Sequence, residues 1–116
     1  MNTPTVEDKI NPVMPHNVAP VSPEEIISVI SDYTGVPVPN IMMQKRFGKR
    51  NVTYARHLAM YMIRCKTKLS LKAISDNYFN GCNHTSIING FKNIKGLSDV
   101  YEETRNDINL INSALK

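Results

Sequence analysis

Apolar residues recur every three or four positions between residues 52 and 66, and this spacing constrains the fold most. The run "VTYARHLAMYMIRCK" predicts a long core helix, because side chains three and four positions apart lie on the same side of a helix. No segment of the sequence alternates polar and apolar residues as a half-buried strand would. The sequence therefore predicts an all-α protein, a compact bundle of about five to six helices.

Residues with helix-capping preferences divide the rest of the chain. Ser22, Pro23 and Glu25 form the start signal of a first helix, which Gly35 ends near Tyr33. A short apolar helical turn is expected at "NIMMQ". Asn51, Ser70 and Asn83 are expected to cap the three helices that follow, and the last helix is expected over 97–115.

The chain divides into two parts by composition. Residues 1–21 contain four prolines and few large apolar residues, which predicts a flexible N-terminal arm. Residues 22–116 carry the helical pattern and are expected to form a single folded domain, as their number also suggests.

The central third of the chain is strongly basic. Nine of the fourteen basic residues lie between Lys45 and Lys72, and no acidic residue occurs between Asp32 and Asp76. Such a one-signed block produces a positive field that attracts polyanions. A merely solvated surface remains the alternative, but double-stranded DNA is the partner that this charge favours.

Several other classes of protein do not fit the sequence. Cys65 and Cys82 are isolated, no secretory leader is evident, and no apolar run approaches the ~20 residues of a membrane helix. We expect a cytoplasmic, nucleoid-associated protein with no membrane contact and no small-molecule substrate. No metal-ligand cluster, cofactor motif or catalytic constellation is present, so an enzyme is not expected.

Residues 70–94 have the parts of a helix-turn-helix: a short capped helix, the turn "FNGC" and a second capped helix. In that motif the first residues of the second helix face base edges in the major groove. Here they are His84, Thr85 and Ser86, with Asn83 at the tip and Asn89 on the same face. Ordinary capping and surface polarity are the alternative reading of these residues.

The sequences "CNHTSI" at 82–87 and "ARHLAMYM" at 55–62 resemble the C-terminal DNA-binding domain of the bacterial chromosomal replication initiator DnaA. The similarity extends over about 24–115 and includes "LSLKAI" at 69–74. The resemblance implies base contacts by Asn83, His84, Thr85 and Ser86, and contacts to the DNA backbone or the adjacent minor groove elsewhere. The residues with that second role are Lys45, Arg46, Lys49, Arg50, Arg56, His57, Lys68, Ser70, Leu71 and Lys72.

Three positions depart from the family pattern. Gly48 stands where the family has its minor-groove arginine, Cys82 replaces another arginine, and Asn83 replaces an aspartate. Asn83 can donate as well as accept hydrogen bonds, which an ionised aspartate cannot. The geometry of binding is therefore expected to persist while the recognised DNA sequence differs from the initiator's.

The family's ATPase module would bring a GxxxxGK[ST] phosphate loop, and the five glycines here never form one. We therefore expect a stand-alone DNA reader that regulates replication or transcription and also contacts a host replication or regulatory protein. A phage or mobile element is a source that suits such a reader. The alternative is a protein-interaction module that kept the fold without binding DNA, with the arm or the acidic last helix as its docking surface.

Overall fold

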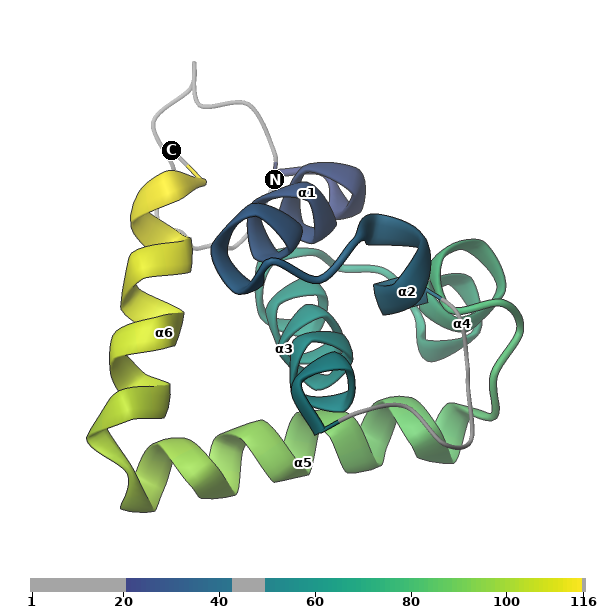
Figure 1. Cartoon of the computed structure of the whole chain (residues 1–116). Coiled ribbons are helices and arrows are strands. Elements are labelled where there is room, and N and C mark those ends of the chain that lie inside the picture. Colours follow the sequence, from purple (N-terminus) through teal and green to yellow (C-terminus); the bar gives the residue numbers. More distant parts are fainter. Residues whose placement is uncertain (1–20, 43–49, 116) are drawn as a thin grey trace, which may run out of the picture.

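The computed structural model describes residues 21–42 and 50–115, and these residues form six α-helices and no strand (Figure 1). The all-α prediction is confirmed. The predicted arm, apart from Val21, and most of the predicted basic loop lie outside the described residues. The helices are α1 (Pro23–Thr34), α2 (Val38–Met42), α3 (Arg50–Lys66), α4 (Leu71–Tyr78), α5 (His84–Val100) and α6 (Glu102–Ala114).

Helix α3 is the centre of the molecule, as its apolar spacing predicts. α1, α2 and α5 all pack against it, and α5 crosses it on the lower side of the view in Figure 1. The α3 side chains at these contacts are fully or almost fully buried, and they join isoleucines from the surrounding helices in one core. The principal members contributed by α3 are Ala55, Leu58, Ala59, Met60, Met62 and Ile63.

Local capping signals account for the starts of two helices and the end of one. The Oγ of Ser22 accepts a hydrogen bond from the Glu25 N–H at 3.1 Å, and Pro23 occupies the first turn of α1. Gly35 ends α1 in the left-handed conformation with φ 79°, which a residue without Cβ adopts without strain. The Oγ of Ser70 accepts from the Ala73 N–H at 3.1 Å and starts α4. These predictions are confirmed.

Two predicted boundaries are wrong near α2 and α3. Asn51 does not cap α3, because Arg50 and Asn51 already lie inside that helix as exposed residues. A capping preference is a statistical bias, and an exposed Asn is tolerated in a first turn at a small cost. Helix α2 begins at Val38, earlier than predicted, and includes Pro39, whose fixed φ suits a first turn.

The largest difference from the sequence prediction concerns α5, which continues through Gly96 to Val100, so that the last helix begins at Glu102. Val100 and Tyr101, which the predicted last helix included, are 71% and 53% exposed and do not face the core. A glycine costs a helix only about 1 kcal/mol, which the packing of a long apolar face overcomes. α6 then turns sharply away from the end of α5 (Figure 1).

A polar cluster ties α6 to the rest of the bundle. The hydroxyl of Tyr54 on α3 donates to Asp107 of α6 at 2.6 Å, and the hydroxyl of Tyr33 on α1 donates to the other oxygen of the same carboxylate. Burial, and next its own hydrogen bond to Asp107, raise the pKa of Tyr54 to about 12. We call these three residues the Asp107 cluster. None of the described helices is long and apolar enough to cross a bilayer.

Candidate nucleic-acid interface

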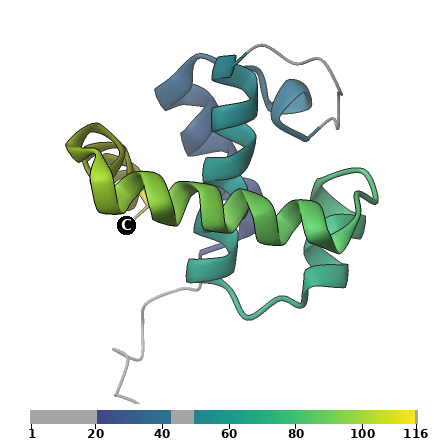
Figure 2. The ribbon, with the colours of Figure 1, turned by 90° about the horizontal axis from the view of Figure 1, so that it is seen from below.

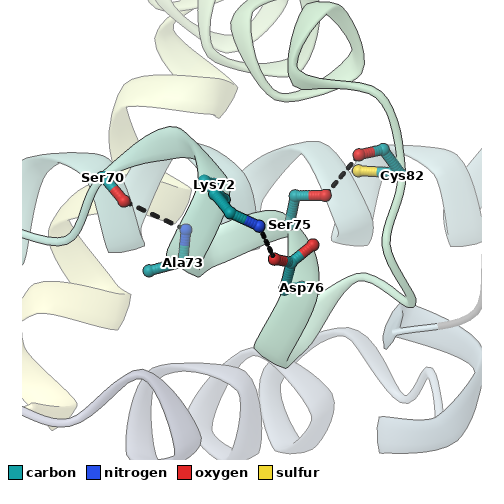
Figure 3. A network of polar contacts seen from close by, with 6 residues as sticks. All are labelled: Ser70, Lys72, Ala73, Ser75, Asp76 and Cys82. Carbon is teal, nitrogen blue, oxygen red and sulfur yellow. Dashed lines mark hydrogen bonds and ion pairs between the residues drawn. The ribbon is translucent and has the colours of Figure 1, made fainter.

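The turn between α4 and α5 is held by its own backbone and by one buried serine. Asn80 and Gly81 take positive φ values of 58° and 70°, and the Gly81 N–H donates to the Ser75 carbonyl at 2.9 Å. The Oγ of Ser75, 1% exposed, donates to the Cys82 carbonyl (Figure 3). This arrangement sets where α5 begins relative to α4, which is the spacing a helix-turn-helix requires.

Asn83 caps α5, as predicted. Its Oδ1 accepts the Thr85 N–H at 2.9 Å, and its carbonyl accepts the Ser86 N–H at 2.9 Å. The side-chain oxygen therefore serves the helix, while the Nδ2 donor makes no hydrogen bond within the described residues. Asn83, His84 and Thr85 are all exposed, so this cap is also a presented surface.

The first two turns of α5 have two different faces. Ile87 and Ile94 are completely buried, whereas Thr85 and Asn89 are exposed and Ser86 is half-buried. Within residues 21–42 and 50–115, the side chains of His84, Thr85, Ser86 and Asn89 form no hydrogen bond or ion pair. Their donors and acceptors are free for a ligand, while the opposite face holds the helix in the core.

α3 approaches α5 closely at Gly90. A Cβ on Gly90 would lie 2.5 Å from the Met60 Sδ and 3.1 Å from the His57 Cδ2. Both distances are shorter than ordinary van der Waals contact, so the position requires a very small side chain. The close approach of α3 therefore accounts for a glycine at this position of α5.

His57 pairs with Asn93 across the same contact. The Asn93 Nδ2 lies 3.0 Å from the His57 Nδ1, which acts as acceptor in that geometry. Burial lowers the pKa of His57, and the neighbouring charge of Arg56 lowers it further. A neutral, half-buried His57 can offer its second ring nitrogen to a phosphate as a neutral donor.

The residues predicted to touch the DNA backbone fall on both sides of α5. Seen from the outer side of α5 in Figure 2, the N-terminal end of α3 and the segment between α3 and α4 lie on opposite sides of the helix. Arg50 is exposed at the first position, and Lys68, Ser70 and Lys72 are exposed at the second, with Leu71 half-buried. Such flanking suits a helix between two phosphate strands. Lys45, Arg46 and Lys49 lie outside the described residues.

Lys72 already has a partner on its own helix. Its Nζ lies 2.8 Å from the Asp76 Oδ2, and both side chains are largely exposed (Figure 3). The hydrogen bond to Asp76 raises the pKa of Lys72. Exposed pairs of this kind are weak, so Lys72 can exchange Asp76 for a phosphate.

Arg56 is not placed with the other residues of this set. Its side chain is 8% exposed, and it donates from Nε to the Ile41 carbonyl and from Nη2 to the Asn40 carbonyl, each at 3.2 Å. The sequence offered no signal for this, because the acceptors are backbone atoms sixteen and fifteen residues away.

Sequence reasoning also missed residues of the longer α5. Lys92, Asn93 and Lys95 are exposed and continue the helix beyond Asn89. Steps of three and four residues relate Asn89 to Lys92 and Asn93, which places them near one face. The uninterrupted helical pattern through Gly96 was the signal that could have found them.

The comparisons with known proteins agree with this geometry. A model of the family described as "Bacterial dnaA protein helix-turn-helix" matches residues 23–94. The chain is 33% identical over 87 residues, 73% of its length, to the Nostoc punctiforme protein named "Chromosomal replication initiator protein DnaA". The Corynebacterium aurimucosum protein of the same name is 33% identical over 107 residues, 87% of this chain, and that of Ehrlichia ruminantium (strain Gardel) is 29% identical over 112 residues, 97% of this chain.

The matches cover only part of each relative. The chain aligns with 18%, 19% and 24% of the lengths of these three proteins, so it spans about a fifth of the relatives it matches. The residues that the family model matches, 23–94, contain α1 to α4 and the first eleven residues of α5. They include the turn, the capping residue and the exposed tip. The chain therefore belongs to the bacterial dnaA helix-turn-helix family, whose domain binds DNA and is not catalytic.

Proposed function

We propose that this protein binds double-stranded DNA at specific sequences and thereby regulates replication or transcription. The observation that carries the proposal is the exposed start of α5, where the side chains of His84, Thr85 and Asn89 form no hydrogen bond within the described residues while Ile87 and Ile94 on the other face are completely buried. Packing within the protein has no use for these side chains, whereas a major groove presents donors, acceptors and thymine methyl groups to them.

The division of labour follows from where each residue lies. Asn83, His84, Thr85, Ser86 and Asn89 would read base edges from the start of α5. Backbone contacts would come from the exposed residues on either side of that helix. His57 would bind a phosphate beside Asn93, and the basic segment before α3 would reach the adjacent minor groove. In the described part, the residues proposed to contact the DNA backbone are Arg50, His57, Lys68, Ser70, Leu71 and Lys72.

The recognised sequence is expected to differ from that of the initiator. Cys82 stands where the family has an arginine. Its side chain is 5% exposed and has no guanidinium group that could contact the groove. Asn83 adds a donor where the family has an acceptor. Two changes at the tip alter the preferred bases, since each good base contact discriminates by about 1 to 3 kcal/mol.

Selection of bound duplexes from a random pool tests the proposal directly. We expect one enriched motif with wild-type protein, and a motif relaxed at one or two base pairs with Thr85→Ala. Arg50→Ala is the matched control, because loss of an exposed cation should weaken all sequences alike. An unenriched pool would contradict sequence-specific binding.

The salt dependence tests the electrostatic part. If about five phosphates are neutralised, log affinity should fall against log salt with a slope near −4.5. Affinity that does not change with salt would exclude the phosphate contacts. A footprint in competition with a bacterial initiator would then show whether the two proteins share sites, as an initiator-blocking regulator requires.

The exposed corner between α5 and α6 supports a second candidate, a protein-interaction module. Val100 and Tyr101 are exposed there beside Asp99, Glu102 and Glu103. A basic surface of a replication or regulatory protein would complement this corner. Binding to random duplex at low salt separates the candidates: no detectable complex would favour the interaction module over the DNA reader.

A further inference from the structure

We propose that Arg56 is a positioning residue that holds the C-terminal end of α2 against the body of the domain, beside the turn that precedes α5, and that it does not contact a DNA phosphate. The inference rests on the proposed DNA-binding mode, because the parts it would position are those that carry the DNA contacts. It reverses the role that family resemblance implies for this arginine.

Two hydrogen bonds of Arg56 end on α2. The carbonyls of Asn40 and Ile41 belong to the last turn of a helix of five residues, where carbonyls have no partner within the helix. A guanidinium offers several N–H donors in a rigid fork and carries the charge that the C-terminal end of a helix favours. Arg56 therefore does for α2 what a C-cap does for a longer helix.

The burial of Arg56 argues against a contact with DNA. At 8% exposure its side chain is less accessible than those of Arg50, Lys68 and Lys72, which are all exposed. A guanidinium that turned toward a phosphate would weaken its hydrogen bonds to the two carbonyls. The hydrogen bond to Ile41 is buried and that to Asn40 is part-buried, and a buried acceptor left without a partner is unfavourable.

The guanidinium also lies close to the turn that leads into α5. Burial lowers the pKa of Arg56, and the nearby Cys82 thiol opposes that change. Cys82 is 5% exposed, its carbonyl accepts from the Ser75 hydroxyl, and it directly precedes the capping residue Asn83. Arg56 thus bonds to the end of α2 and interacts electrostatically with the residue that precedes the capping Asn83.

The consequence for binding is geometric. In the sequence, Met42 is the last residue of α2, and the predicted minor-groove residues Lys45, Arg46 and Lys49 follow it. Holding the last carbonyls of α2 fixes the point from which that segment departs, relative to Asn83. A major-groove contact and a minor-groove contact can then be made together only if this separation is kept.

The first experiment uses the wild-type protein and follows arginine Nε–H signals by nuclear magnetic resonance. We expect slow solvent exchange of the Arg56 Nε–H in the free protein and little change in its shift when a selected duplex is added. Arg50, exposed at the start of α3, should shift on DNA. Fast exchange at Arg56, or a DNA-induced shift as large as that of Arg50, would overturn the proposal.

The second experiment compares Arg56→Lys with Arg50→Lys, the same chemical change at an exposed site. An ammonium keeps the charge but cannot reproduce the fork, so Arg56→Lys should lower affinity at least about tenfold, and Arg50→Lys less than about threefold. Binding is measured at a temperature where unfolding curves show both variants folded. If folded Arg56→Lys binds DNA with an affinity within about twofold of wild type, the positioning role is contradicted. It is also contradicted if the loss of affinity occurs only where the variant is partly unfolded, because such a loss reflects stability alone.

Amide shifts of the free Arg56→Lys protein separate this inference from the proposed function. We expect changes at both 40–42 and 82–85, because Arg56 lies beside both parts. Changes at neither segment would refute the inference whatever the DNA result. If the wild-type protein binds no duplex, the proposed function is refuted. The amide shifts of the free Arg56→Lys protein would still show whether Arg56 positions residues 40–42 and 82–85.

Discussion

The start of α5 and the middle of α6 treat polar side chains in opposite ways. At the start of α5, the side chains of His84, Thr85 and Asn89 are exposed and form no hydrogen bond within the described part of the chain. In α6, the carboxylate of Asp107 accepts hydrogen bonds from the hydroxyls of Tyr33 on α1 and Tyr54 on α3. Polar groups that bond internally maintain the fold, and those left unpaired on a rigid helix are available to a partner. The difference separates stability from recognition within a single domain.

The largest effect should come from the buried face of α5. Ile87→Ala removes a completely buried side chain and should lower the free energy of unfolding by about 3 kcal/mol, through lost burial and a cavity. Thr85→Ala, two residues earlier and exposed, should change it by less than about 0.5 kcal/mol. Urea unfolding measures both. Equal losses would show that the tip also serves the fold.

The next test concerns the close contact at Gly90. Gly90→Val places a branched side chain where even a Cβ would lie 2.5 Å from the Met60 Sδ, and it should destabilise by about 2 kcal/mol. Gly96→Val is the matched control in the same helix, because a Cβ there meets nothing within 4 Å. The control should stay within about 0.5 kcal/mol of wild type. Thermal unfolding of the two variants provides the comparison, and similar melting temperatures would disprove the tight contact.

The Asp107 cluster should matter for stability and not for DNA. Asp107→Asn weakens two tyrosine hydrogen bonds to a carboxylate and should lower the free energy of unfolding by about 1 to 2 kcal/mol. Affinity for a selected duplex, measured where the protein is folded, should be unchanged. Glu103→Gln, exposed on the same helix, should alter neither quantity. A loss of DNA affinity in folded Asp107→Asn would show that this cluster also supports recognition.

The smallest effect is a pH dependence of the same cluster. The pKa of Tyr54 is raised from 10.0 to about 12, first by burial and then by the hydrogen bond to Asp107. The folded state keeps a proton that the unfolded state loses, so the stability from this group is full below pH 10 and is lost as the pH rises toward 12. After allowance for the partial exposure of Tyr54, the loss is about 1 kcal/mol. Unfolding free energies across this range should fall less steeply in Tyr54→Phe, and an unchanged slope would assign the dependence to other groups.

Local signals predicted local structure well. Ser22, Ser70 and Asn83 cap their helices because each accepts a backbone N–H only two or three residues away. The exposed tip followed from the same information, since a helix that buries Ile87 and Ile94 must turn Thr85 and Asn89 outward.

Signals that act over longer distances were read less well. A basic residue on α3 suggested a phosphate contact, and only the fold shows that Arg56 meets carbonyls of α2. The last helix was placed too early because Leu97 and Val100 continue an apolar pattern, although only the first is partly buried. Nothing in the local sequence says which of two apolar residues three positions apart finds a packing partner.

The amino-acid sequence by itself determined the helical class, most helix boundaries, the basic character of the chain and the polar start of α5. These depend on periodicity, capping and charge, which act over a few residues. The tertiary structure decided which polar groups remain free: it buried Arg56 against α2, paired Asp107 with two tyrosines, and left His84 and Thr85 exposed. Availability for a partner depends on what the rest of the chain brings near, and only the packed fold determines that.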